Sequence, residues 1–169
     1  MKNVLLCLSS AAVLFAAGAD AAPATTGAVQ AAPDFDAVSM RRSACYGSCP
    51  VYSIRIEANG DVTFTGEKYV RVKGVHKSTI SRDDVARLAA AFRQAQFATL
   101  RDKYAEELKS CVIFTTDNPS VVISLDRAGK TKTVTYDYGC AGPDVPSKAI
   151  ENLSTTIDTV AGSASLISR

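Results

Sequence analysis

The sequence predicts a two-layer α+β domain, in which a mainly antiparallel sheet of about five strands carries two helices on one face. Several segments alternate apolar and polar residues with period two, and turn residues bound each of them. A segment with apolar residues at helical spacing follows each group of strands. This order occurs twice, which predicts that the other face of the sheet is at least partly open.

The register of the first hairpin follows from its loop. Alternating apolar residues mark a short first strand and then the two strands of the hairpin: Val38, Met40; Tyr52, Ile54, Ile56; Val62, Phe64. A two-residue Asn59-Gly60 loop would place the apolar sets of the hairpin on opposite faces. A three-residue loop that includes Ala58 pairs Ile56 with Val62 instead. We therefore predict a type I turn with Gly60 left-handed in a bulge.

A further strand and the first helix follow. The strand is predicted from Tyr69 to His76, with two valines inward and two basic residues outward: Val70, Val72; Arg71, Lys73. Ser81 and Asp84 have the spacing of a capping box, which predicts the start of a helix. Its apolar stripe consists of Val85, Leu88, Ala89 and Phe92. The chain is then expected to return over the core between Phe97 and Tyr104.

The second half of the chain repeats this order. Two strands with alternating apolar residues flank an Ala128-Gly129 turn: Val121, Ile123, Leu125; Val134, Tyr136, Tyr138. An even-numbered loop keeps both apolar sets on one face, so this register is consistent. Pro146 suits the first turn of a final helix. The apolar stripe of that helix consists of Ile150, Leu153, Ile157 and Val160.

The N-terminus has the pattern of a secretory signal peptide. Lys2 precedes an apolar run over residues 4–17, and Ala19 and Ala21 supply the small side chains of a cleavage site. A membrane-spanning helix would need about 20 apolar residues, so the run is too short to be one. We expect residues 1–21 to be removed by cleavage before Ala22. The mature protein is then periplasmic or secreted, with no stable membrane anchor.

Length and charge set the remaining bounds. The 169 residues allow one domain with its own core. We place this domain at residues 35–165, after a flexible linker rich in Ala, Pro and Thr at residues 22–34. A net charge of +2 gives no reason to expect a nucleic-acid partner. Arg55, Arg71 and Lys73 share the outward face of adjacent predicted strands, which would allow a modest cationic patch for anions or envelope polymers, although most such rows are merely solvated.

Four cysteines remain once the leader, with its own cysteine, has been removed: Cys45, Cys49, Cys111 and Cys140. In an oxidising compartment they predict two disulfides, for which three connectivities are possible. We favour Cys45 with Cys49 and Cys111 with Cys140, because Gly47 lets the short loop fold back on itself. The spacing of the first pair differs from the usual redox motif. A zinc site would need a second close pair.

No constellation of side chains specifies a reaction, so no catalytic residue, metal ligand or cofactor is predicted. His76 is the only histidine, and we expect it to be partly buried and hydrogen-bonded at a strand end. Asp117 lies before a strand, where an Asp side chain commonly bonds the backbone of the turn. These two residues, with Tyr46 in the short cysteine loop, form the candidate functional surface.

Several motifs along the chain together resemble a known bacterial family. They are the segment CYGSCPVY at residues 45–52, followed by Asn59-Gly60, Gly66, Gly74, Thr116-Asp117-Asn118-Pro119, Gly139-Cys140, Ile157-Asp158 and Ala161-Gly162. In these features the chain resembles the domain-of-unknown-function family catalogued as number 6438. The resemblance implies a bacterial envelope or secreted domain with no established activity, and it names no catalytic residue. Cys111 departs from the pattern, so the second bridge rests on the cysteine count alone.

Two functional hypotheses follow. The first is a non-enzymatic exported binding domain that contacts an envelope or extracellular protein or polymer, through its open sheet face or the loop from Cys45 to Cys49. The alternative is a small hydrolase or thiol-redox enzyme built around His76, Asp117 or the Cys45/Cys49 pair. The enzyme hypothesis requires His76, Asp117 and a Ser or Cys nucleophile to converge in one pocket.

Overall fold

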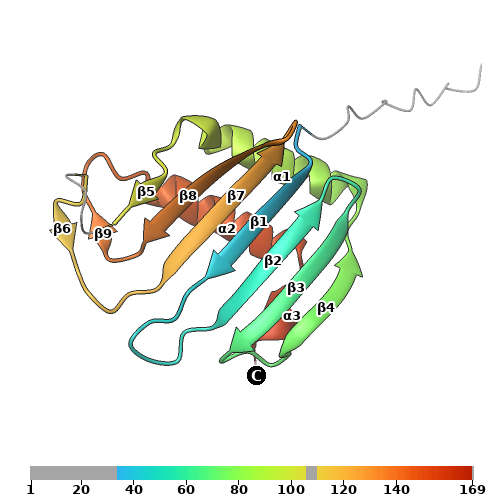
Figure 1. Cartoon of the computed structure of the whole chain (residues 1–169), viewed down its shortest axis with the longest axis horizontal. Coiled ribbons are helices and arrows are strands. Elements are labelled where there is room, and N and C mark those ends of the chain that lie inside the picture. The colour runs from blue at the N-terminus through green and yellow to red at the C-terminus, as the bar shows by residue number, and fades with distance from the viewer. Residues whose placement is uncertain (1–33, 106–109, 169) are drawn as a thin grey trace, which may run out of the picture. The chain divides into compact units, whose positions relative to one another are not determined.

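The computed structural model describes residues 34–105 and 110–168. The predicted signal peptide, its cleavage site and nearly all of the predicted linker lie outside these residues. The elements, labelled in Figure 1, are β1 Ala37–Arg42, β2 Val51–Glu57, β3 Asp61–Lys68, β4 Gly74–Thr79, α1 Arg82–Gln94, the 3-10 helix η1 Phe97–Thr99, β5 Lys103–Tyr104, β6 Ile113–Phe114, β7 Ser120–Arg127, β8 Lys130–Asp137, β9 Cys140–Ala141, α2 Ser147–Val160 and α3 Ala164–Ile167.

The predicted α+β class is confirmed, but the strand count is not. The main sheet has seven strands in the order β4-β3-β2-β1-β7-β8-β5, and β6 pairs with β9 in a second, two-stranded sheet. Every pairing is antiparallel except that of β5 with β8. Strands β5, β6 and β9 have two residues each. An alternating pattern needs at least four residues to be visible, so sequence alone does not detect them.

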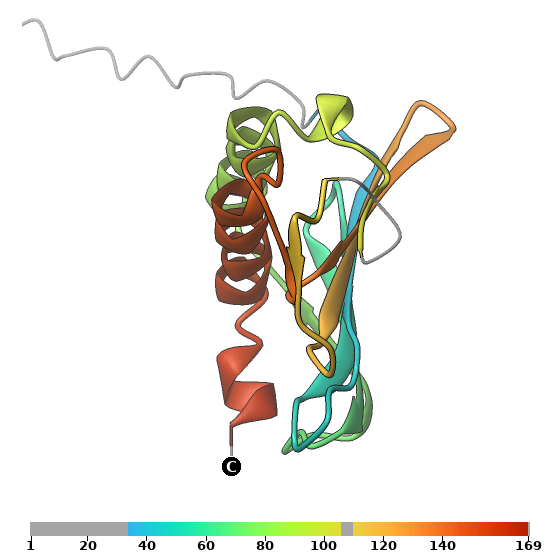
Figure 2. The same ribbon diagram turned by 90° about the vertical axis from the view of Figure 1, so that its left-hand side faces the viewer.

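The helices lie on one side of the main sheet, as predicted, and Figure 2 shows the opposite side without a helix. Both predicted helical stripes are buried against the sheet: Val85, Leu88, Ala89 and Phe92 from α1; Ile150, Leu153, Ile157 and Val160 from α2. Full burial of one such side chain contributes about 1.5–3 kcal/mol. The short helix α3 was not predicted, and it adds the buried Leu166. In the described part of the chain, no helix is long and apolar enough to cross a membrane.

The first hairpin has the predicted register, and Gly60 has the predicted left-handed conformation. Ile56 pairs with Val62, and Ile54 pairs with Phe64. Gly60 is left-handed, with a φ of 94°, and its N–H donates to the Glu57 carbonyl at 2.9 Å. A Cβ at Gly60 would lie 2.7 Å from the carbonyl oxygen of Ile80. Two independent constraints therefore require glycine at this position.

Helix α1 begins with the predicted capping box. The Asp84 N–H donates to the Ser81 hydroxyl at 3.1 Å, and the Asp84 carboxylate accepts from the Ser81 N–H at 3.3 Å. The second hairpin also has the predicted register, since Ile123 pairs with Val134 and Val121 with Tyr136. These local patterns survive in the tertiary structure because packing and propensity favour the same arrangement.

The strand predicted from Tyr69 to His76 is wrong in its start, although Val70 and Val72 do point inward while Arg71 and Lys73 are exposed. Strand β4 begins at Gly74, and all six of its residues are exposed. The preceding segment is a loop whose backbone pairs with the C-terminal end of the domain: the N–H groups of Arg71 and Val72 donate to the carbonyls of Ile167 and Leu166. The alternation of apolar and basic residues from Val70 to Lys73 therefore belongs to a loop. Val70 is buried there although it is not part of a strand.

The predicted cationic patch is also wrong. Arg55 lies on the open face of the sheet, but it forms ion pairs with Glu57 at 2.7 Å and Asp126 at 3.0 Å. The Arg71 guanidinium donates to the carbonyl of Ser165, and Lys73 belongs to the same loop. The three side chains do not form one row, because only Arg55 is on a strand.

Candidate functional site

Both predicted disulfides are present in the structure. Cys45 and Cys49 close the loop between β1 and β2, with their Cα atoms 5.7 Å apart. Cys111 and Cys140 join the segment before β6 to the start of β9, with a Cα separation of 5.0 Å. The first bridge constrains a surface loop. The second ties the small two-stranded sheet together and is anchored in the core, where Cys140 is buried.

The loop at residues 43–50, which we call the stapled loop, lies against the loop that precedes β7. The Tyr46 N–H donates to the Asp117 carbonyl at 3.0 Å, and the Ser43 N–H donates to the Ser120 carbonyl at 2.9 Å. The Ser120 N–H donates in return to the Ser43 hydroxyl at 2.7 Å. Figure 1 shows both loops at the same end of the sheet. The structure thus brings Tyr46 and Asp117 together.

Tyr46 is the most exposed large apolar side chain among the described residues. Its relative exposure is 89%, although a disulfide and backbone hydrogen bonds restrict the loop that carries it. An exposed aromatic ring on a restricted loop loses little conformational entropy on contact with a partner, because much of the ordering has occurred on folding. Tyrosine combines a large apolar surface with a hydroxyl that donates and accepts hydrogen bonds.

Asp117 has a different local role from the one predicted. It is exposed and left-handed, with a φ of 70°, and its carboxylate accepts from the Thr116 hydroxyl at 3.1 Å. The side chain that bonds the turn backbone belongs to Asn118, whose amide donates to the carbonyls of Thr115 at 3.1 Å and Thr116 at 3.2 Å. The Asp117 carboxylate therefore faces solvent beside the stapled loop.

His76 is neither partly buried nor near the other two residues. It is exposed on β4, at one edge of the main sheet, where it pairs with Phe64. Strand β7, which Asp117 precedes, is four positions away in the order β4-β3-β2-β1-β7. At roughly 4.8 Å between neighbouring strands, these two strands are about 19 Å apart. The structure does not bring His76 and Asp117 into one site.

A polar network that sequence analysis did not identify lies at the same end of the sheet as the stapled loop. The Arg42 guanidinium donates to the Asp158 carboxylate and to the Tyr138 hydroxyl, each at 2.8 Å. Asp158 also accepts from the hydroxyls of Tyr52 at 2.8 Å and Ser163 at 2.7 Å. Burial, followed by the adjacent carboxylate, raises the pKa of Tyr52. The sequence did contain a signal: Arg42 continues the inward phase of Val38 and Met40, so its charge required a buried partner.

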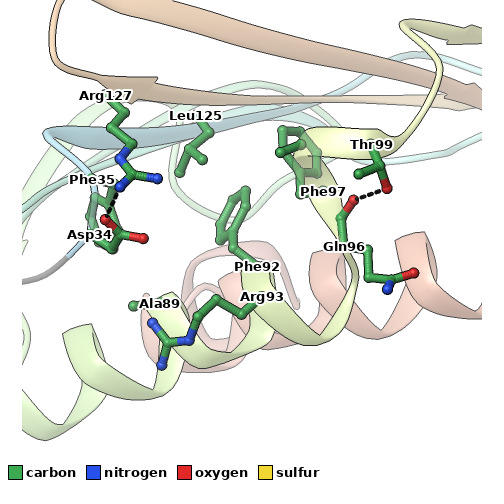
Figure 3. Close-up of a pocket in the computed structure, with 11 residues that line it drawn as sticks. Asp34, Phe35, Ala89, Phe92, Arg93, Gln96, Phe97, Thr99, Leu125 and Arg127 are labelled. Atoms are coloured by element: carbon green, nitrogen blue, oxygen red, sulfur yellow. Dashed lines mark hydrogen bonds and ion pairs between the residues drawn. The ribbon is translucent and has the colours of Figure 1, made fainter.

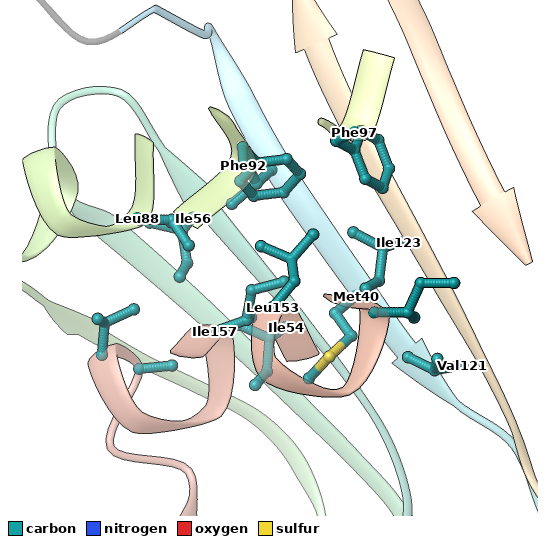
Figure 4. Packing of buried hydrophobic residues seen from close by; sticks show 14 of the residues in the cluster. Met40, Ile54, Ile56, Leu88, Phe92, Phe97, Val121, Ile123, Leu153 and Ile157 are labelled. Carbon is teal, nitrogen blue, oxygen red and sulfur yellow. The ribbon is translucent and has the colours of Figure 1, made fainter. Parts of the chain in front are cut away.

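A cavity of about 290 Å³ lies between the end of α1, η1 and the last residues of β7 (Figure 3). Its floor is apolar and consists of Phe35, Ala89, Phe92, Phe97 and Leu125. Arg93, Gln96 and the Asp34–Arg127 ion pair lie at its rim. Figure 4 shows that Phe92 and Phe97 also belong to the hydrophobic core, so the core itself supports the cavity.

Comparison with models of known protein families shows which family the chain belongs to. The family model of a domain of unknown function, DUF6438, matches residues 36–161. The chain belongs to this family. A comparison with curated proteins finds no match. The matched part of the DUF6438 domain contains both disulfides, Tyr46, Asp117 and the Arg42–Asp158 pair, and it begins just after two residues of the cavity, Asp34 and Phe35.

The cysteine-proline motif of this DUF6438 domain has a clear structural role. Cys45 and Cys49 close the stapled loop, and Tyr52 extends from β2 to the Asp158 carboxylate on α2. The motif therefore connects a surface loop to the helical layer within a few residues. In the described residues, no group of three or more His, Cys, Asp or Glu side chains is arranged to hold a metal ion.

Proposed function

We propose that this DUF6438 domain is a non-enzymatic, exported binding domain that contacts a protein or polymer of the cell envelope or its surroundings through the stapled loop. The observation that carries the proposal is the 89% exposure of Tyr46 on a loop closed by a disulfide. Interfaces concentrate their binding energy in a few aromatic or Arg side chains, and tyrosine is enriched among them.

The stapled loop offers both apolar and polar contacts. Tyr46 supplies an aromatic surface, and Asp117, joined to it by a backbone hydrogen bond, supplies a carboxylate. At the same end of β1, the half-buried Arg42–Asp158 pair ties β1 to α2. A partner would thus bind a surface whose backbone is already ordered. Binding to such a pre-organised surface costs less conformational entropy and favours slow dissociation of the complex.

Export is supported by the two disulfides together with the leader pattern at residues 1–21. Disulfides persist in the periplasm and outside the cell and are rare in the cytosol. The hydrolase alternative loses its main support, because His76 lies on an edge strand far from Asp117. Among the described residues, no histidine or free thiol lies beside Cys45 and Cys49 to assist thiol–disulfide exchange. The redox alternative therefore has no support beyond the cysteine pair itself.

A comparative enrichment experiment tests the proposal. The purified, oxidised protein and two variants, Tyr46→Ser and Val75→Ser, are immobilised and exposed to envelope extracts, and bound material is quantified by mass spectrometry and sugar analysis. Val75 is the matched control, because it is 64% exposed but lies on β4 at the edge of the sheet. We expect a partner that native protein and Val75→Ser retain and Tyr46→Ser loses. Equal retention by all three proteins, or no specific enrichment, would contradict the proposal.

A further inference from the structure

The cavity at the opposite end of β1 and β7 from the stapled loop has the features of a separate small-molecule site. It lies where β1 starts and β7 ends, whereas the stapled loop follows β1 and adjoins the start of β7. We infer that this cavity binds a small apolar carboxylate, with the apolar body against the phenylalanine floor and the carboxylate at Arg93. Such a site is independent of the proposed function, because none of its lining residues belongs to the stapled loop.

The floor of the cavity is preformed. Phe35, Phe92 and Phe97 are all buried. Phe92 and Phe97 pack edge to face, with their ring centroids 4.9 Å apart, which fixes the orientation of both rings. The volume of about 290 Å³ is close to the lower end of the roughly 300–1,000 Å³ that is typical of ligand pockets. The cavity therefore suits a ligand about the size of a substituted benzene ring, not a polymer.

Among the described residues at the rim, Arg93 is a cation without an ion-pair partner. Arg127 is paired with Asp34 at 2.6 Å, so these two charges balance. Arg93 is exposed, and no residue in the described part of the chain forms an ion pair or side-chain hydrogen bond with its guanidinium. An incoming carboxylate would find a free fork of donors at Arg93, and charge-assisted hydrogen bonds of this kind are stronger than neutral ones.

Gln96 also lines the rim, but its side chain points away from the Arg93 guanidinium (Figure 3). Its backbone is left-handed, with a φ of 48°, and its N–H donates to the Arg93 carbonyl at 3.0 Å. This turn ends α1 and directs the chain into η1, which places Phe97 on the floor and the Gln96 side chain at the rim (Figure 3). The partial negative charge at the end of α1 disfavours an anion near the helix carbonyls. The carboxylate is therefore expected against the guanidinium of Arg93, which extends back along α1, away from the end of the helix (Figure 3).

A pair of isosteric probes tests the inference. The purified protein is titrated with 3-phenylpropionate and with the neutral 3-phenylpropanamide, and binding is followed by amide chemical shifts in NMR spectra. We expect shifts concentrated at Phe35, Phe97 and Leu125, and tighter binding of the carboxylate by about tenfold, the factor that one charge-assisted hydrogen bond supplies. Shifts that map elsewhere, or equal affinity for both probes, would overturn the inference.

Two substitutions on α1 sharpen the test. Arg93→Gln removes the rim charge, whereas Arg82→Gln makes the same change on an exposed residue at the start of the helix, away from the cavity. We expect Arg93→Gln to bind both probes with equal affinity and Arg82→Gln to keep the preference for the carboxylate. If the two variants behave alike, Arg93 does not select the ligand. Because the cavity shares no lining residue with the stapled loop, this result is separable from the outcome for Tyr46→Ser.

Discussion

Arg42 and Asp158 form an ion pair of 2.8 Å that joins the last residue of β1 to the last turn of α2. Each of the two side chains is only 22% exposed, so solvent and salt screen the attraction between the charges poorly. The hydroxyls of Tyr52 and Ser163 also donate hydrogen bonds to the Asp158 carboxylate. The ion pair therefore adds a polar link between α2 and the sheet to the apolar contacts between these two layers.

Asp158→Asn should destabilise the domain by about 2 kcal/mol, because it leaves the half-buried Arg42 charge without an anionic partner, with only the Tyr138 hydroxyl to accept from it. Urea unfolding measures the loss. Glu67→Gln is the control, since it breaks a more exposed pair with Arg41, in which the side chains are 37% and 55% exposed. An exposed pair contributes less than about 1 kcal/mol. Equal losses in both variants would show that burial of the Arg42–Asp158 pair adds nothing.

The stability of the domain should fall as the pH rises above about 10. Burial is the main cause that raises the pKa of Tyr52 above its ordinary value of 10.0, and the adjacent Asp158 carboxylate adds to it. A raised pKa in the folded state means that the stabilisation is fully present below the unfolded value and is lost as the pH rises towards the folded value. Urea melts between pH 8 and 11 should show a smaller decline for Tyr52→Phe than for the native protein. Parallel declines would contradict the assignment to Tyr52.

Gly60→Ala should cost more stability than Gly129→Ala. Both glycines are left-handed, with φ values of 94° and 73°. Either substitution carries the cost of a left-handed residue, about 1 kcal/mol. Only at Gly60 would the new Cβ lie 2.7 Å from a carbonyl oxygen, that of Ile80, whereas nothing lies within 4 Å at Gly129. Thermal or urea melts that give the same loss for both variants would show that the hairpin relaxes around the contact.

Removal of the disulfide between Cys111 and Cys140 should cost more than removal of the one between Cys45 and Cys49. The chain-entropy model assigns about 3.5 kcal/mol to the longer loop and about 2 kcal/mol to the shorter one. Double Cys→Ala variants, compared in urea melts, give both values. The Cys45/Cys49 variant should also lose any partner that depends on Tyr46, while the Cys111/Cys140 variant keeps it if it remains folded. A larger loss from the short loop would contradict the entropic account.

Local rules predicted a large part of the fold. The capping box at Ser81, the two helical stripes and the registers of both hairpins were all visible, because each depends on residues close together in the chain. The pairing of Cys45 with Cys49 was accessible for the same reason. The strand expected from Tyr69 failed because its alternation serves a loop that pairs with Leu166 and Ile167, almost 100 residues away. Local propensity holds no information about such a partner.

In the candidate sites, too, the features that depend on residues close together in the chain were predictable, and those that depend on distant residues were not. Tyr46 could be selected from the sequence because a short cysteine loop places it at the surface, but its neighbour Asp117 is 71 residues away along the chain and was brought beside it by a backbone hydrogen bond. The cavity was not predictable, since its floor combines the segment before β1, the end of α1, η1 and the end of β7.

By itself, the sequence determined the α+β class, the family and the short Cys45–Cys49 loop, because periodicity, motifs and close cysteine spacing are properties of short segments. Only the tertiary structure decided that His76 lies on an edge strand, four strand positions from β7, that Arg42 meets Asp158, and that Arg93 lines an apolar cavity. These relationships depend on the order in which the strands are assembled, and that order is set by the burial of the whole core at once.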